Sequence, residues 1–223
     1  MDFTKYVAMI ESQTLFFSRM DALGDPFEGA RSKANFERRR EVYGDIDIPE
    51  EALKGLSRFG EWSRQWTYVN CWHMNDHESA AMWRLYAQTN EAVAIQSTAA
   101  KLCQVLPEKT YVGMVEYIDY EHDWVPEGNS FAALVRKRKS FEHERELRAL
   151  ISEIPVEGEG VPVGKVNPEL GKAVTIALNQ LIENVYVAPS APDWFAELVR
   201  SITTRFGFQF PVIHSSLDAK PLF

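Results

Sequence analysis

Short strand-like runs alternate irregularly with helical segments along the whole chain, and this alternation constrains the fold more than any other feature. Apolar residues spaced three or four apart indicate helices, whereas runs of β-branched and aromatic residues indicate strands. The expected helices cover 2–12, 33–42, 50–64, 78–88, 98–106, 130–138, 169–182 and a last segment from 190 to Gly207. The expected strands cover 14–18, 68–72, 91–95, 111–120, 147–151, 185–187 and 210–214.

The order of these segments lacks the even β-α-β rhythm of a doubly wound parallel sheet. No internal repeat, low-complexity stretch or linker divides the 223 residues, a length that one large domain can fill. We therefore expect an α+β fold: a single compact domain over residues 1–223, with a mixed or split antiparallel-rich sheet and surrounding helices.

Charge and cysteine content narrow the classes of partner. The formal net charge of -8 disfavours a general affinity for nucleic acid or anionic membrane, because like charges repel. Two cysteines give no disulfide framework, and no apolar run approaches the roughly 20 residues of a membrane helix. We expect a soluble, cytoplasmic protein. Two local basic clusters, 31–40 and 136–139, are either solvated helix faces or binding sites for phosphate groups.

The junction from Cys71 to Tyr86 concentrates reactive side chains. Cys71, His73 and His77 are of types that bind soft metals, but a structural zinc needs four close ligands and Cys103 is the one other thiol. We therefore expect no metal. Cys71 is either a nucleophile with a histidine base or a small buried residue beside tryptophans.

Two short acidic turns carry further candidates. Asp25 precedes a proline and is of the type that caps its own loop, while Glu28 could face a pocket and bind a ribose hydroxyl or a guanidinium. Asn75 and Glu78 have the spacing of a capping box at the start of a helix.

Charged residues also precede the strand expected at 147–151. Alternation with period two places Glu144, Glu146 and Arg148 on one face. These three residues either face solvent or pair inside a polar cleft, because burying unpaired charges is costly. Two close carboxylates could also differ in pKa, giving one acid and one ionised stabiliser.

Four segments in this order resemble a bacterial Domain of Unknown Function family (number twenty-nine seventy-one). Its members look like Leu-x-Phe-Ser, Asp-Pro-Phe-Glu, Cys-Trp with Glu-Ser-x-x-Met-Trp-x-x-Tyr, and Glu-x-Glu-x-Arg. The corresponding residues here are Leu15 to Ser18, Asp25 to Glu28, Cys71 to Tyr86, and Glu144, Glu146 and Arg148. Members have an aromatic-basic strand before the first helix, so we expect this chain to lack that first strand.

The chain also resembles, more distantly, the ADP-ribosyltransferases, whose Glu-x-Glu element precedes a strand. The resemblance implies an ADP-ribosyltransferase-like fold with NAD as a substrate, acting in phage defence or toxin systems. It implies Glu146 as the catalytic carboxylate, Glu144 orienting the acceptor, Arg148 holding Glu146 or a phosphate, and Ser18 in the pocket. The remaining candidates for ligand contacts are Arg19, Asp25, Glu28, His73, Glu78, Trp83, Tyr86, Lys137 and Arg138.

A second hypothesis comes from a different functional class. The chain would be a non-catalytic module that binds an anionic ligand or nucleic acid through clusters 31–40 and 136–139. A steep salt dependence of binding would distinguish this hypothesis from turnover of NAD.

Overall fold

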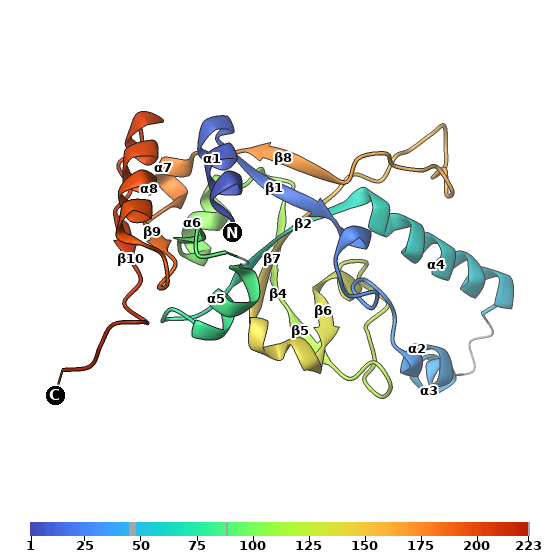
Figure 1. Ribbon diagram of the computed structural model, residues 1–223. Helices are drawn as coiled ribbons and strands as arrows, with labels where there is room; N and C mark the ends of the chain where they lie inside the picture. The colour runs from blue at the N-terminus through green and yellow to red at the C-terminus, as the bar shows by residue number, and fades with distance from the viewer. Residues whose placement is uncertain (45–47, 88, 223) are drawn as a thin grey trace. The chain divides into compact units, whose positions relative to one another are not determined.

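The computed structural model describes residues 1–44, 48–87 and 89–222, and its chain forms two compact units (Figure 1). Unit 1 comprises Met1–Phe16, Asn75–Glu108 and Ala173–Phe223, and unit 2 comprises Phe17–Met74 and Lys109–Lys172. The expected α+β class with an antiparallel-rich sheet is confirmed. The expectation of one domain over residues 1–223 stays a prediction, and each unit is described by itself.

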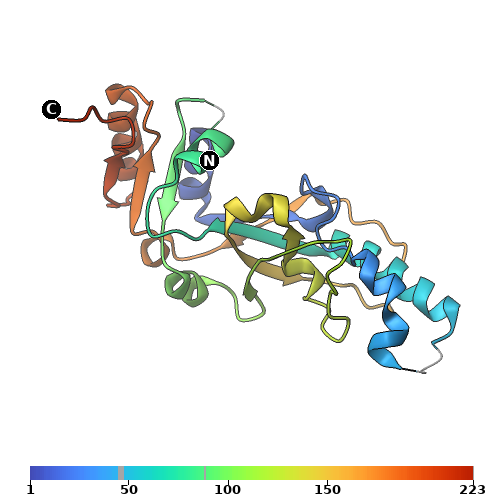
Figure 2. The same cartoon turned by 90° about the horizontal axis from the view of Figure 1, so that it is seen from below.

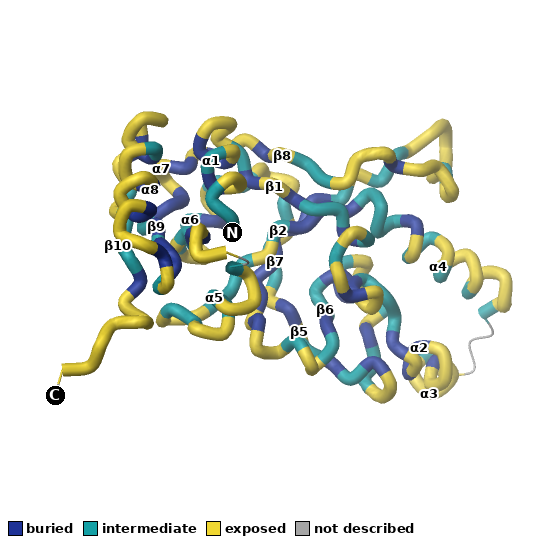
Figure 3. Tube along the Cα trace, in the orientation of Figure 1, coloured by how far each residue is buried: buried dark blue, intermediate teal, exposed yellow. Residues whose placement is uncertain are grey.

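A five-stranded sheet forms the framework of unit 2. Its first and last strands in sequence, β1 and β8, each include a few residues that are assigned to unit 1. Its strand order is β4-β7-β2-β1-β8. The strands are β1 (Thr14–Arg19), β2 (Thr67–His73), β4 (Tyr111–Met114), β7 (Glu146–Ser152) and β8 (Gly171–Thr175). β7 pairs antiparallel with both β2 and β4, and Cys71 lies opposite Arg148 and His73 opposite Glu146. β7 is therefore an interior strand, and Figure 3 shows it buried along most of its length.

The segment between β4 and β7 folds back over one face of this sheet. It contains the parallel pair β5 (Glu116–Ile118) and β6 (Arg136–Arg138) and the 3-10 turns η3 (Ala133–Val135) and η4 (Lys139–Glu144). Leu134 packs in one core with Met20, Val69 and Leu150. Figure 2 shows the yellow η4 segment lying across the strands. Polar residues of β6 thereby come to lie against β7.

Further helical segments of unit 2 are η1 (Met20–Ala22), α2 (Lys33–Glu37), α3 (Arg39–Tyr43), α4 (Glu50–Ser63) and η2 (Arg64–Trp66). Ser32 and Asn35 form the capping box of α2. The Asn35 side chain also donates to Val125 O at 2.7 Å and accepts from Val125 N at 3.1 Å, which ties α2 to a distant loop. α4 carries Glu50 and Glu51 in its first turn, where the helix dipole favours negative charge.

Unit 1 packs helices against a three-stranded sheet of order β10-β9-β3. Its elements are α1 (Phe3–Ser12), β3 (Val93–Gln96), α5 (Ala80–Tyr86), α6 (Ala99–Val105), α7 (Leu178–Leu181), β9 (Asn184–Val187), α8 (Asp193–Arg205) and β10 (Val212–His214). A hydrogen bond of 2.6 Å joins the buried Tyr6 and Thr203 hydroxyls, so α1 is tied to α8. In the described ranges, no helix is both long enough and apolar enough to cross a bilayer.

Two expected helices are wrong because strand pairing overrides local propensity. Segment 130–138 forms η3 and then β6, whose Lys137 lies opposite Tyr117 of β5. Segment 169–182 forms β8, which adds an edge strand beside β1, and only the four-residue α7. A helical spacing of apolar residues therefore did not suffice to predict either segment.

Three boundaries also differ from expectation. The strand expected at 111–120 breaks between β4 and β5 at Val115, where the chain leaves β7 for β6. The helix expected at 33–42 breaks at Arg38, whose ψ of 10° departs from helical geometry. The helix expected at 78–88 begins at Ala80, because Ser79 rather than Asn75 caps it by accepting from Met82 N; residue 88 lies outside the described residues.

Candidate functional site

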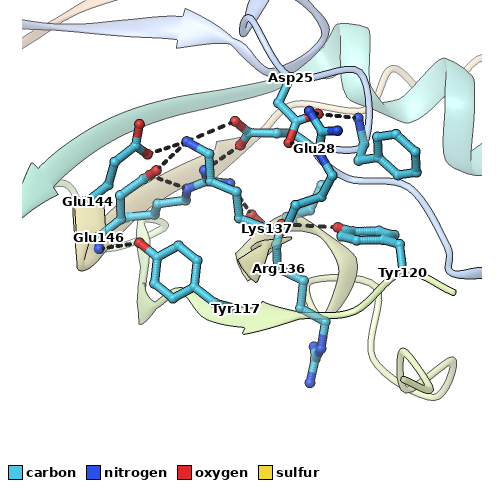
Figure 4. Close-up of polar contacts among 12 residues, drawn as sticks. Asp25, Glu28, Tyr117, Tyr120, Arg136, Lys137, Glu144 and Glu146 are labelled. Atoms are coloured by element: carbon cyan, nitrogen blue, oxygen red, sulfur yellow. Dashed lines mark hydrogen bonds and ion pairs between the residues drawn. The ribbon is translucent and has the colours of Figure 1, made fainter. Parts of the chain in front are cut away.

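Glu144, Glu146 and Arg148 come together in unit 2 with two further charged residues, as Figure 4 shows for most of them. Lys137 reaches the group from β6, and Glu28 reaches it from the turn after Asp25. We call these five residues the ionic cluster. All are buried: Glu146 is 5% exposed and Arg148 is 0% exposed. Of the two alternatives, solvent exposure is therefore excluded, and the three motif residues pair inside the protein.

Each cation of the ionic cluster contacts several acceptors. Lys137 Nζ donates to Glu146 Oε1 at 2.7 Å and to Glu144, and it lies 3.3 Å from Glu28 Oε1. Arg148 donates from Nε to Glu146 Oε2 at 2.8 Å and from Nη2 to Glu28. Its Nη1 donates to the Leu134 carbonyl at 2.9 Å. The cluster thus ties β7 to β6, to η3 and to the turn at Glu28.

These contacts fix the charge state of the cluster. Burial alone would raise the pKa of Glu146, but hydrogen bonds with Arg148, Glu144 and Lys137 outweigh burial and hold that pKa far below its usual range. Burial alone would lower the pKa of Lys137, but its hydrogen bonds to Glu144 and Glu146 raise the pKa well above its usual value. Glu146 is therefore an ionised carboxylate at neutral pH and Lys137 a cation, so Glu146 can stabilise positive charge but is a poor proton donor.

The set contains three carboxyl groups and two cations, because Glu28, Glu144 and Glu146 face Lys137 and Arg148. The ionised Glu146 carboxylate favours positive charge that develops nearby, because the low effective dielectric of a buried site strengthens the attraction. Tyr117 adds a neutral contact, since its hydroxyl accepts a hydrogen bond from Glu146 N at 2.8 Å. Sequence reasoning missed Tyr117, which carries no signal beyond its place in a strand-like run.

His73 lies opposite Glu146 on β2 and faces the same side of the sheet. Its Nδ1 lies 2.6 Å from the Glu144 carbonyl oxygen, so Nδ1 carries a proton and donates. Nε2 is buried and has no hydrogen-bond partner among the described residues. His73 Nε2 is therefore a polar atom beside the ionic cluster that is not yet engaged.

Cys71 lies opposite Arg148 and keeps an exposed surface. The protein packed around its thiol raises the pKa of Cys71 strongly; Arg148 opposes this shift and Glu146 adds to it. The thiol is consequently protonated at neutral pH, which disfavours Cys71 as a nucleophile, because the thiolate is the reactive form. In the part of the chain that the structure describes, no group of three His, Cys, Asp or Glu side chains is arranged to hold a metal ion.

The other predicted ligand residues of unit 2 make structural contacts. Asp25 caps its own turn by accepting from Phe27 N at 3.1 Å, and it holds Arg138 through two contacts of 3.0 Å. Arg19 donates to Asp21 at 2.6 Å and to the Asn167 carbonyl at 2.6 Å. Ser18 of β1 lies opposite Val69 of β2, and Val69 lies opposite Leu150 of β7. Leu150 is four residues further along β7 than Glu146. The structure does not bring Ser18 to the ionic cluster.

Three predicted ligand residues belong to unit 1. Trp83 Nε1 donates to Glu78 Oε2 at 3.0 Å, so these two side chains hold each other at the start of α5. Tyr86, at the end of the same helix, is exposed. Their roles in ligand binding stay predictions.

The two basic clusters are largely neutralised by carboxylates from elsewhere in unit 2. Within 136–139, every residue pairs with an acid: Arg136 with Glu116, Lys137 with the ionic cluster, Arg138 with Asp25 and Lys139 with Asp123. Within 31–40, Arg31 and Arg39 both contact the same carboxylate, that of Glu127. Phosphate binding through these clusters stays a prediction, and it would require a phosphate to displace carboxylates that are already in place.

Comparison of the chain with protein-family models, with curated proteins and with solved structures found no match.

Proposed function

We propose that unit 2 carries an ADP-ribosyltransferase-like site, in which Glu146 stabilises positive charge on a sugar. The observation that carries this proposal is the buried, ionised Glu146 carboxylate, which Lys137 and Arg148 hold in place. Loss of nicotinamide from NAD breaks the bond between the ribose carbon and the ring nitrogen, and the electron pair leaves with nicotinamide. The carbon becomes oxocarbenium-like, which an adjacent fixed carboxylate favours.

His73 supports the same site. The contact with the Glu144 carbonyl places a proton on Nδ1. When the ring carries that proton alone, Nε2 can accept a hydrogen bond from a ribose hydroxyl or from the attacking group. The nucleophile's lone pair then forms the new bond to the ribose carbon, and its proton passes to His73 Nε2 or to water. The Glu144 carbonyl holds the imidazole ring of His73 and thereby orients the nucleophile that Nε2 contacts.

Lys137 would control access to Glu146. Lys137 holds Glu146 Oε1 and Arg148 holds Oε2, so a substrate hydroxyl reaches the carboxylate by taking the place of Lys137. Lys137 keeps Glu144 and Glu28 as partners when it moves. The exchange therefore leaves no buried ammonium without a counter-charge, which would otherwise be costly.

The setting we propose is the bacterial cytoplasm, where NAD is available and where the two free cysteines stay reduced. Phage defence or a toxin system is the process that the resemblance suggests.

The test is NAD consumption by the purified full chain, compared with Glu146→Gln and with the exposed Glu142→Gln as a matched control. We expect Glu142→Gln to turn over NAD at the wild-type rate and Glu146→Gln to lose at least about 100-fold, as expected for loss of one electrostatic contact to the transition state. If Glu146→Gln does not fold, His73→Ala replaces it. Absent turnover in the wild type, or equal turnover in all variants, contradicts the proposal.

A further inference from the structure

A cavity of about 430 Å³ lies in unit 2 between α4, the turn after Glu28 and the loop from Val125 to Leu134. Its volume is in the range of small-molecule sites. None of the residues of the ionic cluster lines it, so it is distinct from the site described above. Its lining mixes apolar side chains such as Phe36, Phe59 and Leu134 with the arginines Arg31 and Arg64.

Both arginines have spare hydrogen-bond donors. Arg31 Nη1 and Arg64 Nε are buried atoms that find no hydrogen-bond partner among the described residues. A buried donor without a partner costs free energy, so such groups mark positions where a ligand or water completes the structure. The neighbouring hydroxyls are already engaged, since Ser57 donates to Leu53 O and Ser63 to Gly60 O within α4.

The surroundings of Arg31 select for a single negative charge. Glu127 lies 3.4 Å from Arg31 Nη1, but Arg39 holds it through two hydrogen bonds of 3.2 and 2.5 Å. Arg31 is thus only partly neutralised, while Glu127 and the lining residue Glu61 repel a second negative charge. A carboxylate carries one charge at neutral pH and a phosphate monoester nearly two, so the carboxylate fits better.

The rest of the cavity calls for an apolar ligand body. Phe36 and Leu56 line the cavity and are 59% and 47% exposed. A ligand ring packed against them would remove this apolar surface from water. Aromatic and aliphatic walls with a few fixed polar groups are typical of small-molecule pockets.

The walls of the cavity are held in place before any ligand arrives. Arg148 fixes the Leu134 carbonyl on one side and Glu28, the neighbour of Gly29, on the other. Gly29 has φ of +76°, and a Cβ there would lie 3.3 Å from Arg64 Cγ, so this glycine admits the arginine stem. A preformed site loses less conformational freedom on binding.

We propose that this cavity binds a small aromatic or aliphatic monocarboxylate, with Arg64 and Arg31 holding the carboxylate. The arginine N–H groups donate to the carboxylate oxygens, and Phe36, Leu56 and Phe59 contact the ligand body. The site does not depend on the Glu146 chemistry, and it could hold an effector or an acceptor substrate.

The first experiment measures binding of benzoate to the full chain by calorimetry, with benzyl alcohol and phenyl phosphate as probes of charge. We expect benzoate to bind at least about 10-fold more tightly than either comparator, because charge-assisted bonds to arginine are strong. Equal binding of benzyl alcohol, or tighter binding of phenyl phosphate, contradicts the monocarboxylate assignment. No benzoate binding at millimolar concentration contradicts it as well.

The second experiment locates the site with two matched glycines of α4. Gly60 lines the cavity and Gly55 does not, and a Cβ at either position meets no atom within 4 Å. Gly60→Trp should therefore fill the cavity and abolish benzoate binding, while Gly55→Trp should leave the affinity unchanged. Arg64→Gln should weaken binding about 10-fold and the exposed Arg58→Gln should not. Unchanged affinity in both Gly60→Trp and Arg64→Gln would overturn the proposal.

Discussion

The ionic cluster and the cavity of unit 2 both hold arginines with buried nitrogen atoms, and they differ in whether those atoms have partners. In the ionic cluster, Arg148 donates from Nε, Nη1 and Nη2, and each of these atoms has an acceptor. In the cavity, Arg64 Nε and Arg31 Nη1 have no hydrogen-bond partner among the described residues. The comparison teaches that a dense set of charges is not by itself a binding site. Hydrogen-bond donors without partners that lie beside apolar walls are a stronger indication of a binding site.

Replacing Arg148 should give the largest effect on stability. Arg148→Met leaves Glu28 and Glu146 buried without their main cation, so the free energy of unfolding should fall by about 3–5 kcal/mol. Urea unfolding of the purified chain measures this change. Arg40→Met on α3 is the exposed control, and its effect should stay within about 0.5 kcal/mol. Similar losses in both variants would show that the cluster does not hold unit 2 together.

Replacing Lys137 should have the next largest effect. Lys137→Met removes the cation shared by three carboxylates, and we expect a loss of about 3 kcal/mol, while Arg148 still pairs Glu28 and Glu146. Its neighbour Lys139 is exposed and pairs with Asp123 at 3.4 Å, so Lys139→Met should cost less than about 1 kcal/mol. Equal costs at the two lysines would remove the distinction between buried and exposed pairs.

Acid should weaken the cluster through Glu146. Its pKa in the folded state lies below the unfolded value of about 4.3, so its contribution is fully present above that pH and is lost as the pH falls below it. The free energy of unfolding should therefore fall more steeply between pH 5 and pH 3 (roughly the window of carboxylate titration) in the wild type than in Glu146→Gln. Glu142→Gln should keep the wild-type slope. Identical slopes in all three proteins would show that Glu146 is not held ionised.

The smallest effect on stability should come from the cavity. Arg64→Met removes a donor that has no hydrogen-bond partner, so the free energy of unfolding should change by less than about 0.5 kcal/mol. The exposed Arg58→Met, on the preceding helix α4, is the control and should behave alike. A loss comparable to that of Arg148→Met would mean that Arg64 is structural rather than available to a ligand.

The sequence predicted the features of the ionic cluster that depend on neighbouring residues. Period-two alternation placed Glu146 and Arg148 on one face of a strand, and both lie there in β7. The antiparallel-rich sheet and most helices followed from runs of apolar residues. Segment 169–182 failed because pairing with β1, which is far away in the chain, outweighed its helical spacing.

The partners of the charged residues could not be predicted from the sequence. Glu28 lies 120 positions from Arg148 and Asp25 lies 113 positions from Arg138. No local sequence pattern predicts pairs that are so far apart in the chain. The basic clusters therefore looked like open cationic surfaces, although carboxylates reach them from distant segments. The cavity was also missed, because it forms only where α4 meets two loops that are separate in sequence.

One measurement tests the contrast between the two regions most directly: the arginine Nε–Hε resonances in a proton–nitrogen NMR spectrum recorded during titration with benzoate. We predict that the Arg64 resonance shifts with benzoate while the Arg148 resonance stays in place and its Hε exchanges slowly with solvent, because Arg148 Nε already donates to Glu146 at 2.8 Å. Arg64→Gln and Arg148→Met assign the two signals. A shift of the Arg148 resonance with none at Arg64 would contradict the account.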